Sequence, residues 1–189
     1  MPLKLKLCNV HTILEKIIVI GDDDNIYLLR FINENNSDSR YSNEDGIIRE
    51  FKTKIKAYTG CIKNSIEIRH GMTYATKLLK EELESNFVGK LQKFNIAIHP
   101  IGTQFQHITW SSIVLVPYGN TSSYGEQIKL IGKENASRAL GKASSANQIL
   151  ILISCHRIVT SCGKGIGRYS AGIERKQWLI NHEKRFSIY

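Results

Sequence analysis

Cysteine, proline and long apolar runs are all scarce in this 189-residue sequence. Its four cysteines include no Cys-x-x-Cys pair and are too few for a disulfide framework, which favours a reducing compartment. The N-terminus lacks the continuous apolar core of a signal peptide, and no segment approaches the roughly 20 apolar residues of a membrane span. We therefore expect a soluble protein without membrane contacts, in the cytoplasm or, in a eukaryote, the nucleus.

Acidic residues are scarce in the second half of the chain. Residues 1–92 contain 14 Lys/Arg and 13 Asp/Glu, whereas residues 93–189 contain 12 and 4. The formal net charge is +9, so nearly all of the positive excess belongs to the second half. This distribution favours a polyanionic partner, although charge alone leaves nucleic acid at about even odds.

The first half has the pattern of a small α/β unit. Apolar runs at residues 17–20 and 26–31 flank an acidic, glycine-led turn and predict a β-hairpin, and residues 33–45 predict a loop. The segment 74–87 has apolar residues on a helical repeat and predicts an amphipathic helix. A break in periodicity at 94–103 predicts the connection between two domains, 1–92 and 93–189.

The second half begins with helical patterns. Residues 104–116 predict a helix that buries Phe105, Ile108, Ile113 and Val116. Two further helices, 123–131 and 136–145, are joined by a turn containing glycine and predict a helix-turn-helix. The second of them carries small and basic residues, which suit close approach to a nucleic-acid groove. Helical hairpins of this spacing are common, so the pattern alone does not establish DNA binding.

An apolar run at residues 151–153 leads through Ser154 into Cys155, His156 and Arg157. We expect a buried, strand-like segment that positions the cysteine. A thiol beside a histidine is the arrangement of an activated nucleophile. The alternative is a small buried cysteine next to a structural histidine, which is the commoner situation for an isolated pair.

The order and spacing of six motifs decide between these alternatives. They are Val-Pro-Tyr-Gly at 116–119, Ser-Tyr-Gly-Glu at 123–126, Ala-Ser-Arg-Ala-Leu-Gly at 136–141, Asn147, Cys-His-Arg-Ile-Val at 155–159 and Tyr-Ser-Ala-Gly-Ile-Glu-Arg-Lys at 169–176. Together they closely resemble the O6-alkylguanine-DNA alkyltransferases, over residues 94–183. The resemblance implies an α/β N-terminal domain that is ribonuclease H-like, and a mainly α C-terminal domain with a winged-helix-like helix-turn-helix. The first half resembles the family only loosely.

The resemblance implies direct-reversal DNA repair, in which each protein molecule moves one alkyl group from guanine O6 onto its own Cys155. It makes His156 the base that takes the thiol proton through a water. Glu183 then orients the imidazole, and the Tyr124 hydroxyl assists the leaving guanine. The implied substrate-binding residues are Asn147 as a hinge, Ile158, Tyr169 and the backbone N–H of Ser170.

The implied partner is double-stranded DNA containing alkylated guanine, bound by a monomer that needs no cofactor. The target base is flipped out of the stack, and Arg138 fills the space that it leaves. The recognition helix enters the minor groove with Ser137, Lys142 and Ser144. Methyl adducts of guanine are the expected substrates, and O4-methylthymine is a possible lesser one.

Four positions depart from the family pattern. Ser154 stands where proline nearly always precedes the cysteine, Gln148 and Leu150 stand where some members have prolines, and Ala171 replaces a frequent glycine. Because Leu150 and Ala171 are larger or differently shaped, they predict a narrower alkyl pocket. Ser154 gains an N–H and conformational freedom that proline lacks.

Two other functions remain as alternatives. The first is a non-catalytic lesion-binding protein of the alkyltransferase-like group, which lacks the cysteine that this chain has. The second is a plain helix-turn-helix regulator, which leaves Cys155, His156 and Glu183 unexplained. Cys8, His11 and His99 do not have the spacing of a four-ligand zinc site, so no metal is predicted.

Overall fold

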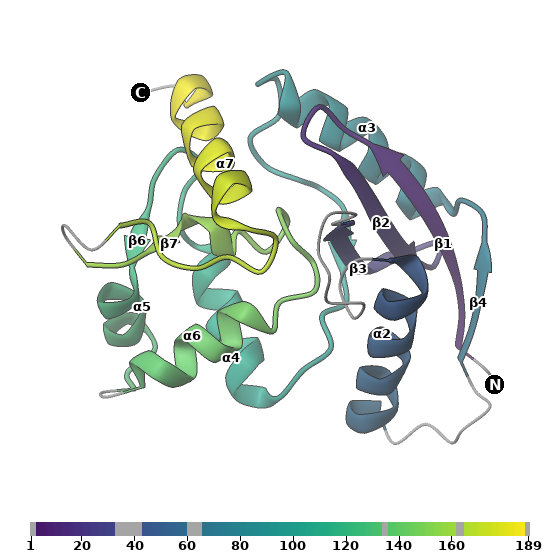
Figure 1. Cartoon of the computed structure of the whole chain (residues 1–189), viewed down its shortest axis with the longest axis horizontal. Helices are drawn as coiled ribbons and strands as arrows, with labels where there is room; N and C mark the ends of the chain where they lie inside the picture. The colour runs from purple at the N-terminus through teal and green to yellow at the C-terminus, as the bar shows by residue number, and fades with distance from the viewer. Residues whose placement is uncertain (1–2, 33–42, 60–65, 134–135, 162–164, 188–189) are drawn as a thin grey trace. The chain divides into compact units, whose positions relative to one another are not determined.

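The computed structural model describes residues 3–32, 43–59, 66–133, 136–161 and 165–187 (Figure 1). Its contacts divide the chain into two compact units, Met1–Glu84 with Asn95–Gly102, and Ser85–Phe94 with Thr103–Tyr189. The domain boundary expected after residue 92 falls inside the stretch where the two units alternate. None of the described helices is both long and apolar enough to cross a bilayer.

The first unit is built on a five-stranded sheet with the order β4-β1-β2-β3-β5. Strands β1, β2 and β3 are antiparallel neighbours, whereas β4 pairs parallel with β1 and β5 pairs parallel with β3. The hairpin predicted from the acidic turn is confirmed by the pairing of β2 with β3. The strand bounds are β1 Leu3–His11, β2 Lys16–Gly21, β3 Asn25–Phe31, β4 Ile66–His70 and β5 Ala97–Ile98.

Helices cover the two faces of this sheet. Helix α2, Glu44–Thr59, buries Ile47, Phe51 and Ile55 against Leu5 and Leu7 of β1 and their neighbours. Helix α3, Tyr74–Phe87, was predicted and is confirmed. Its Thr76 contacts Cys8 and lies near Gly21 on the opposite face. The expected loop at 33–45 overlaps α2 at its end, and residues 33–42 lie outside the described part of the chain.

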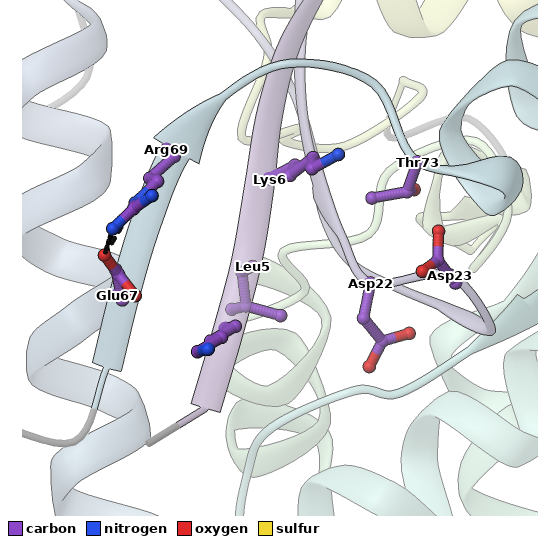
Figure 2. Close-up of a pocket in the computed structure, with 8 residues that line it drawn as sticks. Leu5, Lys6, Asp22, Asp23, Glu67, Arg69 and Thr73 are labelled. Atoms are coloured by element: carbon purple, nitrogen blue, oxygen red, sulfur yellow. Dashed lines mark hydrogen bonds and ion pairs between the residues drawn. The ribbon is translucent and has the colours of Figure 1, made fainter.

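A charged pocket of about 280 Å³ opens beside β1 and β4 (Figure 2). Its acidic side chains already have structural partners. Asp22 accepts from the Tyr27 hydroxyl at 2.8 Å, Asp23 accepts from the Tyr74 backbone N–H at 3.2 Å, and Glu67 pairs with Arg69. These contacts fasten the β2–β3 turn and the start of α3. None of the residues that line this pocket is a cysteine or a histidine, so the pocket contains neither a thiol nucleophile nor an imidazole base.

The second unit is mainly helical. Its elements are α4 Gln104–Val114, β6 Ser122–Ser123, α5 Tyr124–Leu130, α6 Ser137–Ser145, the 3-10 turn η1 Cys155–Arg157, β7 Ile158–Val159 and α7 Ile173–Phe186. Helices α5 and α6 confirm the predicted pair of helices, and the indole N–H of Trp110 in α4 donates to the Ala143 carbonyl at 2.9 Å. The predicted burial of Ile108 is wrong. Ile108 is 40% exposed because Thr109 and Trp110 occupy the inward face of α4 instead.

The predicted strand before Cys155 is also wrong, although its residues are buried. Residues 150–154 form tight turns, and Ile151 has a positive φ of 70°. The Asn147 side chain replaces a partner strand: its carbonyl accepts from the Ile149 N–H at 2.9 Å and its amide donates to the Ile153 carbonyl at 2.9 Å. A positive φ is strained for a β-branched residue, so this loop holds its shape against a local cost of about 1–3 kcal/mol.

Candidate active site

Cys155 begins the turn η1 and is almost completely buried. The Asn147 amide donates to its Sγ at 3.2 Å, so Asn147 contacts both the loop and the sulfur. Burial raises the pKa of the Cys155 thiol to about 11, although the Asn147 hydrogen bond and the charge of Lys176 act in the opposite direction. The resting cysteine is therefore a thiol, and it needs a base before it can attack an electrophile.

His156 is fully buried beside the cysteine, with Nε2 2.8 Å from Glu183 Oε1. Burial lowers the pKa of His156, and the neighbouring Glu183 only partly offsets this. The imidazole is therefore neutral at pH 7, and its Nε2–H donates to the carboxylate. That tautomer leaves the lone pair on Nδ1, which is buried and has no hydrogen-bond partner among the described residues. Nδ1 can accept a proton.

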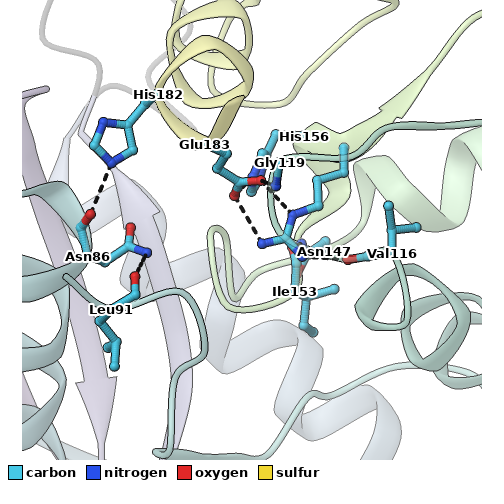
Figure 3. A network of polar contacts seen from close by, with 10 residues as sticks. Asn86, Leu91, Val116, Gly119, Asn147, Ile153, His156, His182 and Glu183 are labelled. Atoms are coloured by element: carbon cyan, nitrogen blue, oxygen red, sulfur yellow. Dashed lines mark hydrogen bonds and ion pairs between the residues drawn. The ribbon is translucent and has the colours of Figure 1, made fainter. Parts of the chain in front are cut away.

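Glu183 is held from three directions (Figure 3). Besides His156, it accepts from Arg157 through Nε at 2.9 Å and Nη2 at 3.0 Å, and from the Gly119 backbone N–H at 3.2 Å. Arg157 in turn donates to the Val116 carbonyl at 2.6 Å. Burial alone raises the pKa of the Glu183 carboxyl, but the hydrogen bonds and charges of His156 and Arg157 outweigh it and lower the pKa to about 2. Glu183 is thus ionised at neutral pH.

Lys176 of α7 is a functional candidate that sequence reasoning missed. Its side chain is fully buried, and its Nζ donates to the carbonyls of Ile158 at 2.5 Å and Arg168 at 3.3 Å. Burial lowers the pKa of Lys176 to about 8, and a negative charge on Cys155 raises it. One signal was available in the sequence: Lys176 shares the apolar face of its helix with Leu179 and Ile180 and is three to four residues from each.

Two tyrosines stand beside these groups. The Tyr124 ring is partly buried at the start of α5, and burial together with the nearby Cys155 raises the pKa of its hydroxyl. The Tyr169 ring lies edge-on to His156 with centroids 6.4 Å apart, and burial raises the pKa of Tyr169 well above its usual value. Both hydroxyls stay protonated at neutral pH and are available as donors. Gly167 lies close to both Tyr124 and Lys176: a Cβ at this position would be 3.6 Å from the Tyr124 ring and 3.7 Å from the Lys176 Nζ.

The other two expected substrate residues lie in different environments. Ile158 is fully buried in β7, where it pairs with Ser122 of β6 and gives its carbonyl to Lys176. Ser170 is exposed in the turn before α7. The structure thus buries two polar pairs, Asn147 with Cys155 and His156 with Glu183, which adjoin along the chain, and it leaves Ser170 at the surface.

Comparisons with known proteins agree with this arrangement. A family model described as "6-O-methylguanine DNA methyltransferase, DNA binding domain" matches residues 104–185. A methylated-DNA–protein-cysteine methyltransferase of Methanosarcina acetivorans is 37% identical over 124 residues, which are 64% of this chain and 79% of the relative. One of Mycobacterium leprae is 41% identical over 103 residues, 54% of this chain and 62% of the relative. The chain belongs to the methylated-DNA–protein-cysteine methyltransferase family.

The fold of this methyltransferase agrees with solved structures. The O6-methylguanine methyltransferase of Mycobacterium tuberculosis superposes with a TM-score of 0.75 at 24% identity, over 97% of this chain and 95% of that one. The O6-methylguanine-DNA methyltransferase of Pyrococcus kodakaraensis superposes with a TM-score of 0.62 at 20% identity, over 95% of this chain and 98% of that one. The M. tuberculosis protein has also been solved in complex with DNA. This methyltransferase therefore has the family's fold of a mixed sheet and helices.

Helix α6 of this methyltransferase exposes three of its four expected DNA-contacting residues and buries the fourth. Ser137, Arg138 and Lys142 are exposed, whereas Ser144 is only 7% exposed and faces the interior with Leu140 and Ala143. The helical repeat accounts for this, because residues 140, 143 and 144 share one face. Direct DNA contact by Ser144 is not supported by this placement.

Ser154 has a backbone that proline can adopt, with φ −74° and ψ 48°. It is the centre of a tight turn in which the Cys155 N–H donates to the Ile153 carbonyl at 2.7 Å. Restoring the methyltransferase pattern with Ser154→Pro is expected to raise the free energy of unfolding by about 0.4–1 kcal/mol, because proline restricts the unfolded chain. Urea denaturation of both proteins measures the difference. A loss of stability would show that the serine N–H or hydroxyl is needed.

Proposed function

We propose that this chain repairs O6-methylguanine in double-stranded DNA by moving the methyl group irreversibly to Cys155. The supporting observation is the buried network in which an ionised Glu183 holds a neutral His156 beside the thiol. In the reaction, the thiol proton passes through a water to Nδ1 of His156. The Sγ–methyl bond forms as the methyl–O6 bond breaks, and the electron pair of that bond stays with the guanine.

Three other groups complete this scheme. The Tyr124 hydroxyl, kept protonated by its raised pKa, donates to the leaving guanine. The exposed turn at Ser170 offers a backbone N–H for O6, and Tyr169 lines the site beside His156. Asn147 holds the sulfur in place, and the buried Ile158 supports the wall. The product is a thioether that none of these residues can cleave, so each molecule acts once.

Access to the base requires flipping it out of the duplex, at a cost of a few kcal/mol. Helix α6 presents Ser137, Arg138 and Lys142 to solvent, in accordance with a helix that enters a groove. We infer that Arg138 occupies the vacated stack. Because most contacts are then to phosphate and groove shape, binding is weakly sequence-specific and strongly salt-dependent.

Replacing Arg138 by Ala is expected to slow repair of methylated duplex DNA by at least about tenfold, because the flipped state loses the group that fills the stack. Reaction with the free base O6-methylguanine should stay near the wild-type rate. Single-turnover assays on the two substrates measure the ratio, and Lys142→Ala is the matched control for loss of one charge on the same helix. Equal losses on both substrates would remove the stack-filling role.

The finer architecture also belongs to the proposal. Three antiparallel strands followed by β4 parallel to β1 support a ribonuclease H-like first domain. We propose residues 1–92 for it, with the exchange that the contacts show at this boundary: Ser85–Phe94 pack with the second unit and Asn95–Gly102 with the first. In residues 93–189, the helices α5 and α6 beside the small β6–β7 sheet support a winged-helix-like DNA-binding domain. We propose that the protein acts as a monomer in the cytoplasm or, in a eukaryote, the nucleus.

We propose that Leu150 and Ala171, which are both buried in the second unit, narrow the alkyl pocket as inferred from the sequence. Methyl adducts are therefore the proposed substrates, with O4-methylthymine as a lesser one. Competition between methylated and benzylated guanine for one equivalent of protein measures this selectivity.

The deciding experiment incubates the protein with a duplex that carries labelled O6-methylguanine and maps the label by peptide mass spectrometry. The proposal expects one equivalent of methyl group on the peptide containing Cys155 and none in Cys155→Ser. Tight lesion binding without transfer by the wild type would instead support the non-catalytic, alkyltransferase-like alternative. Sedimentation of the protein with and without duplex tests the monomer.

A further inference from the structure

Helix α7 carries two different sets of contacts on two of its faces. Lys176 and Glu183 belong to the active-site face described above. Trp178, His182 and Phe186, which are four residues apart, form an aromatic row on a second face. Successive residues of an α-helix are rotated by about 100°, so His182 and Glu183 point in different directions from neighbouring positions.

The aromatic row contacts the segment Ser85–Phe94, which belongs to the same unit and which we name the clasp. His182 Nε2 lies 3.0 Å from the Asn86 carbonyl, and the Gln92 side chain donates to the Phe186 carbonyl at 2.8 Å. The Asn86 side chain closes the clasp on itself by donating to the Leu91 carbonyl at 2.7 Å (Figure 3). The clasp packs closely against α7, because a Cβ added to Gly89 would lie only 2.2 Å from the Phe186 ring.

His182 is the best-anchored member of this row. Its ring stacks on Trp178 with centroids 4.8 Å apart and planes inclined by 8°, and it contacts Phe186 at 4.9 Å and Phe87 at 6.2 Å. It is also buried and makes its hydrogen bond to a residue 96 positions away in the sequence. A ring packed on three sides and bonded at one nitrogen cannot turn without breaking these contacts, so it resists rotation of α7 about the helix axis.

We propose that His182 is a positioning residue for the alkyl-transfer reaction, because it fixes the rotation of α7 that brings Glu183 onto His156. The inference rests on the function proposed above. Side chains end about 5–6 Å from a helix axis, so a roll of only about 10° moves the Glu183 carboxylate by about 1 Å. The His156–Glu183 distance of 2.8 Å leaves no room for such a shift without loss of the hydrogen bond. A misplacement of about 1 Å can cost a rate factor of about 100.

The test compares His182→Ala with His182→Gln, whose amide can still donate to the Asn86 carbonyl. Gln92→Ala is the matched control, because it removes a different hydrogen bond between the same clasp and α7. Histidine ¹⁵N NMR follows the Nε2–H of His156, and the rate of Cys155 alkylation by iodoacetamide is recorded against pH. The pH profile reports the titratable groups around the thiol, namely Lys176, His156, Tyr124 and Tyr169, together with the Glu183–Arg157 pair that contacts His156.

In His182→Ala, the His156 Nε2–H signal should be lost, the alkylation rate at pH 7 should fall by at least about tenfold, and the profile should move to higher pH. His182→Gln should recover most of the rate, and Gln92→Ala should lower only the melting temperature. A His182→Ala protein with a lower melting temperature but an unchanged His156 signal and profile would overturn the inference. Failure of the proposed relay would be recognised separately. In that case, Glu183→Gln would have the same alkylation-versus-pH profile as the wild type.

Discussion

Replacing Glu183 by Gln is expected to have the largest effect of any single substitution outside the cysteine itself. The guanidinium of Arg157 would remain buried without its carboxylate, and an unpaired buried charge of this kind costs about 3–5 kcal/mol of stability. The imidazole of His156 would also lose the carboxylate that fixes its tautomer, because a Gln amide can either accept from Nε2 or donate to it, so methyl transfer should slow by about 100-fold or more. Chemical denaturation and single-turnover transfer at low temperature measure the two effects.

A double variant separates stability from chemistry. Arg157→Met combined with Glu183→Gln removes both members of the buried pair and should recover much of the lost stability. It should not recover the rate, because His156 still lacks its carboxylate. Recovery of transfer along with stability would show that Glu183 acts only by keeping the fold intact.

The same pair predicts acid sensitivity. The pKa of Glu183 is lowered from 4.5 to about 2 in the folded protein, so its contribution to stability is fully present above the unfolded value and is lost as the pH falls through the folded one. Stability should therefore decline between about pH 4.5 and 2. In the double variant this part of the decline should be absent.

Local periodicity predicted the hairpin and several helices, but two elements with equally clear periodicity were not predicted. The hairpin at residues 17–31 and the helix 74–87 have clear periodicity, and both formed as expected. Strand β1 was not predicted, although its Leu and Lys side chains alternate at residues 3–7 in the period-2 pattern of a half-buried strand. Helix α2 was not predicted either, although Ile47, Phe51 and Ile55 recur every four residues, as on one face of an amphipathic helix.

The active-site loop shows why pattern and structure can disagree. The apolar run at residues 151–153 predicts a buried strand, and its residues are indeed buried. Asn147, however, bonds the Ile149 N–H and the Ile153 carbonyl with one side chain, which allows turns where a strand would need a neighbouring strand. Motif matching named Cys155, His156 and Glu183, and the structure places the side chains of His156 and Glu183 2.8 Å apart. Motif matching did not show that Arg157 and Lys176 are buried with them, because charged residues in a basic half are expected at the surface. For Lys176, the apolar face that it shares with Leu179 and Ile180 was the available signal.

Replacing Lys176 by Met is the second prediction with a large expected effect. Methionine keeps the apolar stem but removes the ammonium whose charge lowers the pKa of Cys155. The thiol pKa should then rise further above about 11, and each unit of rise removes about nine-tenths of the thiolate at neutral pH. We therefore expect methyl transfer at pH 7 to slow by about 10–100-fold, with the rising limb of the pH–rate profile displaced to higher pH.

Two controls make this prediction specific. Lys184→Met removes an exposed lysine from the same helix and should leave the profile unchanged. Stability supplies an independent readout: Lys176 loses its proton near pH 8 when folded but at 10.5 when unfolded, so the unfolded state binds more protons and stability should rise from pH 8 to 9. The rise should disappear in Lys176→Met. If both the alkaline rise and the pH–rate profile survive the substitution, the ammonium exerts no field at Cys155, and His156 with Glu183 must activate the thiol alone.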